Sequence, residues 1–154
     1  MTDTMHKSDT RDIVVQEVFP HAPETIWNAL TSGALIARWL MEPVGFEPVV
    51  GSRFTFHTTP AGQWDGTIHC EVLEAAPNRR FAYSWKGGHD SNDGYGSLLD
   101  TVVTWALEPT EAGTRVTLTH AGFEMPRNET AFRNMSGGWN KVVPRLRAIT
   151  DDLN

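Results

Sequence analysis

Hydrophobic and polar residues alternate with a period of two through the middle of this chain, a pattern that predicts β-strands with one buried face. The alternation is clearest at 52–58, 66–77 and 79–88. A further run at 100–123 contains two strands separated by a turn at 109–113, because proline and glycine interrupt strands. The short connections predict consecutive antiparallel strands that bury the same face.

Helical spacing replaces this alternation on both sides of the meander. After a first strand at 12–20, Pro23 is placed to begin a helix, and Ser32-Gly33 separates it from a second short helix. Near the C-terminus, apolar residues recur every three or four positions and predict one amphipathic helix of ~30 Å. Its apolar stripe consists of Phe132, Met135, Trp139, Val142, Leu146, Ile149 and Leu153.

Two adjacent glycines and a proline interrupt this last helical pattern. Gly137 and Gly138 each cost about 1 kcal/mol relative to alanine in a helix interior. Pro144 removes a backbone hydrogen bond. We expect the glycines to permit close contact between helix and sheet, with a hinge as the alternative. The prediction is a helix broken or bent between Ser136 and Pro144, with Trp139 turned toward the sheet.

The order of these elements predicts a single α+β domain. A long amphipathic helix that follows a meander has one good burial site, the apolar face of that sheet. A chain of 154 residues has the size of one domain and can bury a core without a disulfide or metal. Residues 1–11 are polar and are expected to be a mobile N-terminal tail, so the domain is expected to span 12–154.

Composition and motifs narrow the classes of function. A net charge of −6 with scattered basic residues argues against nucleic-acid binding, and no apolar run is long enough for membrane insertion. The single cysteine and the lack of an apolar signal segment indicate a cytoplasmic protein. The glycine-rich stretch at 86–97 leads into a strand, so we interpret it as a flexible loop, which could act as a lid. We expect no metal and no cofactor.

Large aromatic and sulfur-containing side chains are concentrated on the predicted inner face. Most of them must form the core, yet large flat side chains on a curved sheet pack imperfectly and methionine adapts to irregular spaces. We therefore predict a cavity between the sheet and the last helix that binds a small apolar or aromatic molecule. The candidate lining residues are Phe56, Cys70, Tyr83, Trp85, Trp105, His120, Met125, Phe132, Met135 and Trp139.

His120 has two interpretations at this point. It could be a core histidine bonded to a neighbouring carbonyl, or a polar group inside the cavity that orients a ligand or titrates. The second interpretation would suit a cyclase or hydrolase with His120 or Tyr83 as its acid–base group. No catalytic motif accompanies these residues, so we favour binding without catalysis. A chaperone-associated interaction module is the third hypothesis.

Three segments taken together resemble a known family. The segments "APETIWNALTSGALIARWL", "GTRVTLTHAGF" and "GGWNKVVPRL" resemble bacterial homologues of the activator of Hsp90 ATPase C-terminal domain. That domain belongs to the SRPBCC superfamily, with START domains, the birch-pollen allergen and a calicheamicin-resistance protein. The resemblance extends from about Asp12 to Asp151. It implies a helix-grip (Bet v 1-like) fold, in which a curved antiparallel sheet of about seven strands wraps around the C-terminal helix and two short helices follow the first strand.

The resemblance leaves the function open. Members of the superfamily bind lipids and hormones, cyclise polyketides, assist chaperones or sacrifice themselves to toxins, so the fold does not define the activity. The eukaryotic co-chaperone engages Hsp90 through a separate N-terminal domain for which this chain has no room. An Hsp90-type partner is therefore not expected, whereas a homodimer is possible.

Overall fold

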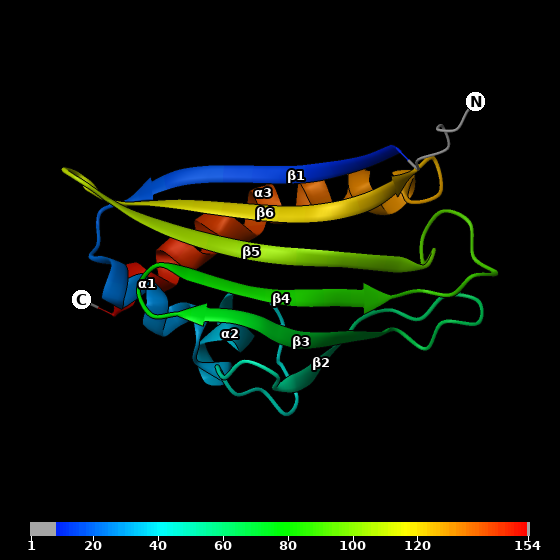
Figure 1. Ribbon diagram of the computed structural model, residues 1–154, viewed down its shortest axis with the longest axis horizontal. Coiled ribbons are helices and arrows are strands. Elements are labelled where there is room, and N and C mark those ends of the chain that lie inside the picture. Colours follow the sequence, from blue (N-terminus) through cyan, green and yellow to red (C-terminus); the bar gives the residue numbers. More distant parts are fainter. Residues whose placement is uncertain (1–8, 154) are drawn as a thin grey trace.

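The computed structural model describes residues 9–153 as one curved sheet that wraps around a long helix (Figure 1). The elements, in chain order, are β1 (Asp9–Phe19), α1 (Pro23–Leu30), α2 (Gly33–Trp39), β2 (Arg53–His57), β3 (Thr67–Ala76), β4 (Arg80–Gly87), β5 (Leu99–Thr110), β6 (Gly113–Met125) and α3 (Glu129–Asp152). The six strands are antiparallel to their neighbours, in the spatial order β1-β6-β5-β4-β3-β2. The predicted helix-grip arrangement is confirmed.

The number of strands and the first residue of β1 differ from the expectations. The sheet has six described strands rather than seven, because Val44 makes only an isolated antiparallel bridge with Thr55. Gly45, with φ at 78°, turns the chain away directly afterwards. β1 begins at Asp9, three residues before the predicted domain boundary at 12, and Asp9 pairs with Met125. The remainder of the predicted tail, residues 1–8, lies outside the described residues.

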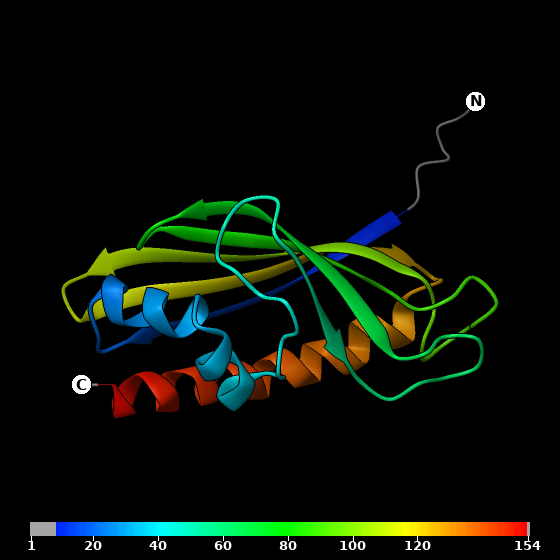
Figure 2. The same cartoon turned by 90° about the horizontal axis from the view of Figure 1, so that it is seen from below.

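Both short helices begin where the sequence predicts. Pro23 is the first residue of α1, where a missing N–H removes no helical hydrogen bond. Ser32 separates the helices and caps α2, with its Oγ accepting a hydrogen bond from the Leu35 amide at 3.3 Å. Figure 2 shows α1, α2 and α3 on the same side of the sheet. That face therefore carries the hydrophobic core.

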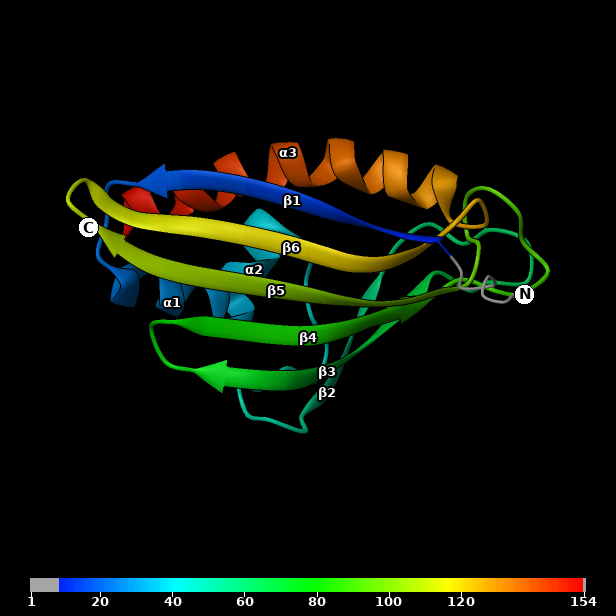
Figure 3. The same cartoon turned by 45° about the horizontal axis from the view of Figure 1, so that its top comes forward.

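The long helix α3 packs against β1 and β6, and Figure 3 shows it running along the β1 side of the sheet. It continues without interruption from Glu129 to Asp152, so a break between Ser136 and Pro144 is wrong, and a bend there stays a prediction. Pro144 and Asn140, whose carbonyl loses its helical partner, both lie on the exposed side, where water can replace the lost bond. The predicted orientation of Trp139 is confirmed, since its side chain is 3% exposed and faces the sheet. No helix of the described chain, α3 included, is long and apolar enough to cross a membrane.

The glycine pair in α3 does not mediate close contact. Apart from its two chain neighbours and the backbone of the helix itself, a Cβ atom added to Gly137 or Gly138 would meet no heavy atom within 4 Å. The expected close approach between helix and sheet at these residues is therefore wrong. The glycines leave open space at this point of the helix.

A chain of hydrogen bonds links α3 to three strands of the sheet. The Trp139 Nε1–H donates to His120 Nδ1 at 3.0 Å. Because Nδ1 accepts, the ring proton of the neutral imidazole lies on Nε2, which donates to Thr101 Oγ1 at 2.8 Å. The Thr101 hydroxyl in turn donates to the Trp85 carbonyl at 2.7 Å. All donors in the chain therefore point from α3 toward β4.

Aromatic packing encloses this chain of hydrogen bonds. The Trp139 ring meets Trp85 and Trp105 edge to face, with centroid distances of 5.8 and 5.9 Å. The His120 ring lies 4.6 Å from that of Phe123, and His120 is fully buried. Burial disfavours the imidazolium and lowers the pKa of His120 from 6.5 to about 3. His120 therefore stays neutral in the folded protein at physiological pH.

The buried neutral His120 predicts a loss of stability in mild acid. Below about pH 6.5 the unfolded chain binds a proton at His120 that the folded chain does not bind until about pH 3. The free energy of unfolding therefore falls as the pH decreases through this window, with a contribution of at most about 1.4 kcal/mol per pH unit. In His120→Gln this contribution is absent, and urea unfolding from pH 7 to 4.5 should show a shallower decline than in the wild type. Equal slopes for the two proteins would contradict the buried neutral state.

The open space around the glycine pair predicts that both positions accept alanine. Gly137→Ala and Gly138→Ala should each raise the free energy of unfolding by about 0.5–1 kcal/mol, because alanine reduces the conformational freedom of the unfolded chain and meets no steric barrier here. Urea unfolding of the two variants measures this gain. A destabilised Gly138→Ala would show that the helix does contact the sheet at this residue.

Candidate functional site

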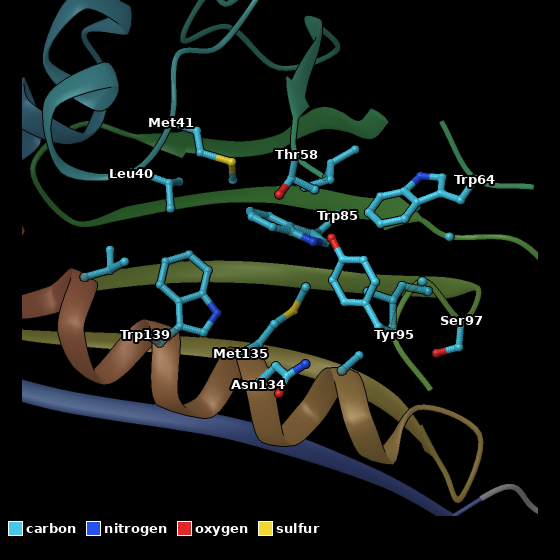
Figure 4. A pocket seen from close by; sticks show the side chains of 18 residues that line it. Leu40, Met41, Thr58, Trp64, Trp85, Tyr95, Ser97, Asn134, Met135 and Trp139 are labelled. Carbon is cyan, nitrogen blue, oxygen red and sulfur yellow. The ribbon is translucent and has the colours of Figure 1, made fainter. Parts of the chain in front are cut away.

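An apolar pocket of about 230 Å³ lies between the sheet and α3 (Figure 4). The helix contributes Ala131, Asn134, Met135, Gly138, Trp139 and Val142. The sheet contributes chiefly Ile68 and Trp85, and the end of α2 adds Leu40 with the neighbouring Met41. Two loops that connect strands at one end of the sheet complete the lining.

These two loops bring a pair of aromatic residues to the pocket. The ring centroids of Trp64 and Tyr95 are 5.9 Å apart. The Trp64 Nε1–H donates to the Thr67 carbonyl at 2.9 Å, and the Tyr95 hydroxyl donates to the Thr59 carbonyl at 2.7 Å. Both rings are thus held in place by backbone acceptors, although neither residue lies in a strand or helix.

The loop between β4 and β5 is also attached to the beginning of α3. The Asn128 side-chain amide donates to Ser97 Oγ at 3.0 Å and to the Leu98 carbonyl at 2.9 Å. Arg127 and Asp90 form an ion pair between the same two segments. The position of Tyr95, which belongs to this loop, is therefore coupled to the position of the helix.

The pocket lining contains no charged side chain and no histidine. Its side chains that carry a nitrogen or oxygen atom are those of Thr58, Trp64, Trp85, Tyr95, Ser97, Asn134 and Trp139. Within residues 9–153, no group of three or more histidine, cysteine, aspartate or glutamate side chains is arranged to hold a metal ion. The chemistry of this site is therefore that of apolar contact with a few neutral hydrogen-bonding groups.

Three of the ten candidate residues line the pocket: Trp85, Met135 and Trp139. The remaining seven lie outside this lining; they are Phe56, Cys70, Tyr83, Trp105, His120, Met125 and Phe132. Sequence analysis also missed several lining residues, among them Leu40, Met41, Trp64 and Tyr95. A signal for the last two was available, because each is a single aromatic residue within a polar loop.

Most of the seven residues outside the lining belong to the core between the sheet and the helices. The Phe56 ring packs against Trp85, with a centroid distance of 5.6 Å. The Tyr83 hydroxyl accepts a hydrogen bond from Trp105 Nε1 at 3.2 Å. Burial raises the pKa of Tyr83 above its ordinary value and that of the Cys70 thiol to about 12, so both groups remain protonated.

The other members of this set lie toward the beginning of α3 or behind Trp139. The Phe132 ring packs against that of Phe123, with a centroid distance of 5.5 Å. Met125 is the last residue of β6 and is partly buried. His120 is a core histidine, as the first interpretation proposed, but it bonds to the side chains of Trp139 and Thr101 rather than to a carbonyl. Both of its ring nitrogens are occupied.

Comparisons with known proteins agree with this architecture. Residues 20–151 match the sequence profile of the family described as Activator of Hsp90 ATPase homolog 1-like protein. No curated protein sequence matches the chain.

Solved structures of other proteins have a similar fold. Protein MLL2253 from Mesorhizobium loti is 34% identical, with a TM-score of 0.81 over 94% of this chain and 99% of that one. CalU16 from Micromonospora echinospora is 24% identical, with a TM-score of 0.68 over 92% of this chain and 76% of its own. The Aha1 dimer from Colwellia psychrerythraea is 20% identical, with a TM-score of 0.67 over 89% of this chain and 93% of that one. The last two show similarity of fold alone.

The family match covers most of the chain, and the Mesorhizobium structure is similar along nearly its whole length. By sequence and by fold, this chain belongs to the Activator of Hsp90 ATPase homolog 1-like protein family.

Proposed function

We propose that the chain binds a small, neutral, apolar or aromatic molecule, such as a lipid, a polyketide or a similar metabolite, in the pocket between the sheet and α3. The observation that carries the proposal is the lining itself, which surrounds about 230 Å³ with apolar and aromatic groups and contains no charge. Ligand sites in proteins are characteristically concave and mostly apolar, with a few polar groups that fix orientation.

The absence of charge from the lining supports a neutral ligand. An ionised group transferred from water into this pocket would lose its hydration without gaining an ionic partner, which is strongly unfavourable. Gly138 contributes to the available space, because it lines the pocket and has no Cβ atom. The adjacent Gly137 is not part of the lining and offers a matched control.

The positions of His120 and Tyr83 favour binding over acid–base catalysis by these two residues. Neither lines the pocket, so neither would touch a molecule that occupies it. Tyr83 is buried beside Trp105, and His120 lies behind Trp139. A homodimer and a cytoplasmic location remain predictions for this chain, and light scattering of the purified protein would test the first.

Two dyes that differ by a single charge test the proposed function. N-phenyl-1-naphthylamine is neutral, and 8-anilinonaphthalene-1-sulfonate has the same ring skeleton with an added sulfonate. The neutral dye should bind the wild type at least about tenfold more tightly, because the lining cannot pair the sulfonate. Fluorescence titration measures both dissociation constants.

The glycine pair then tests whether the dye occupies this pocket. Gly138→Leu should fill part of the space and weaken binding of the neutral dye at least about tenfold, whereas Gly137→Leu, with the same added volume one residue away, should bind like the wild type. No binding of the neutral dye, or equal effects of the two variants, would contradict the proposal.

A further inference from the structure

One polar group at the pocket has no hydrogen-bond partner within the protein. The Trp85 side chain is 3% exposed, and its Nε1–H makes no hydrogen bond. Among residues 9–153, it is the single buried side-chain nitrogen or oxygen atom in this condition. Folded proteins leave few such groups, because an unpaired buried donor has lost its bond to water without replacement. An isolated exception beside a pocket therefore points to a ligand.

Other tryptophans in the described chain show that this fold does supply acceptors to indole groups. The Nε1–H groups of Trp39 and Trp64 donate to backbone carbonyls at 3.0 and 2.9 Å. Those of Trp105 and Trp139 donate to side chains at 3.2 and 3.0 Å. Trp85, surrounded by the same core, differs from them in that its donor remains unpaired.

Packing fixes the orientation of the Trp85 indole. The ring is contacted by Phe56, His120 and Trp139, with centroid distances of 5.6, 5.3 and 5.8 Å. In Figure 4, the nitrogen-bearing edge of the ring points to the side of the pocket where Tyr95 lies and away from Trp139. The unpaired donor is thus held at a defined place in the wall of the pocket.

We propose that the Trp85 Nε1–H donates a hydrogen bond to an oxygen atom of the bound molecule. The ligand class is a neutral aromatic compound with a carbonyl, ether or hydroxyl oxygen attached to its ring system. This inference rests on the proposed function and adds to it the polar group that orients the ligand. Because Nε1 is covered in the free protein, a neighbouring side chain must shift, and Met135 is suited to this as a flexible residue of the same lining.

A cycle of two ligands and two proteins tests the inference. 2-Acetylnaphthalene and 2-ethylnaphthalene share one ring system and nearly one shape, and differ by a carbonyl in place of a methylene group. Trp85→Phe keeps an aromatic side chain and removes the donor. We expect the ratio of the two dissociation constants to change by about tenfold between wild type and Trp85→Phe, with the acetyl compound losing more, as measured by calorimetric titration.

The outcomes separate the two proposals. If both compounds bind and their affinity ratio is the same in both proteins, the Trp85 inference is wrong and the proposed function stands. A water molecule that satisfied Nε1 equally well would give this result. If neither compound binds the wild type, the proposed function fails and the inference fails with it.

A second measurement uses the wild type and does not depend on the stability of the variant. The Trp85 indole Nε1–H gives a signal in ¹H–¹⁵N correlation spectra, which nuclear Overhauser contacts with the neighbouring Phe56, His120 and Trp139 rings assign in the wild type. On addition of 2-acetylnaphthalene this proton should shift downfield as its hydrogen bond forms, and 2-ethylnaphthalene should not produce the shift. Identical responses to the two compounds would overturn the assignment of Trp85 as the donor.

Discussion

The hydrogen bond between Trp139 of α3 and His120 of β6 is the contact on which the rest of the site depends. It lies in a fully buried setting, where an unpaired imidazole or indole group would cost about 1–3 kcal/mol. The bond fixes the tautomer of His120 and, through Thr101, reaches the backbone of Trp85. One chain of directed hydrogen bonds thereby sets the position of the helix relative to β4, β5 and β6.

The pocket exists because small residues surround this fixed contact. Trp139 reaches the sheet, while Gly138 and Ala131 on the same helix have little or no side chain to fill the space beside it. Gly87 and Gly88 form part of the opposite wall, where an added Cβ atom would meet the Trp64 ring or the Ser97 backbone rather than open space. The large aromatic rings hold helix and sheet together, and the small residues leave the space between them unfilled. The same segment of α3 therefore provides both the anchor and the volume.

The sequence predicted which face of the sheet a side chain occupies better than whether it lies in the core or at the pocket. The period of two correctly placed Tyr83 and Trp85 on one inner face, and both are buried. One lies within the core and the other at the pocket, however, and this depends on where α3 crosses the sheet, which local periodicity does not encode. Trp64 and Tyr95 lie in loops without any period. For Gly138, sequence alone could not distinguish close contact from empty space, since both are compatible with a missing Cβ.

The direction of donation along the hydrogen-bond chain also distinguishes His120, whose polar atoms are all paired, from Trp85, whose indole N–H is not. Both nitrogens of His120 are engaged, so the imidazole has no free lone pair for a substrate, and its protonation would break the bond from Trp139. The donors point toward β4 and end at the carbonyl of Trp85, which leaves the indole N–H of that residue outside the chain. Among residues 9–153, every buried side-chain nitrogen or oxygen atom except this donor has a hydrogen-bond partner. An uncharged pocket with a buried unpaired donor in its wall would discriminate between aromatic molecules by the position of an oxygen atom, which a purely apolar cavity cannot do.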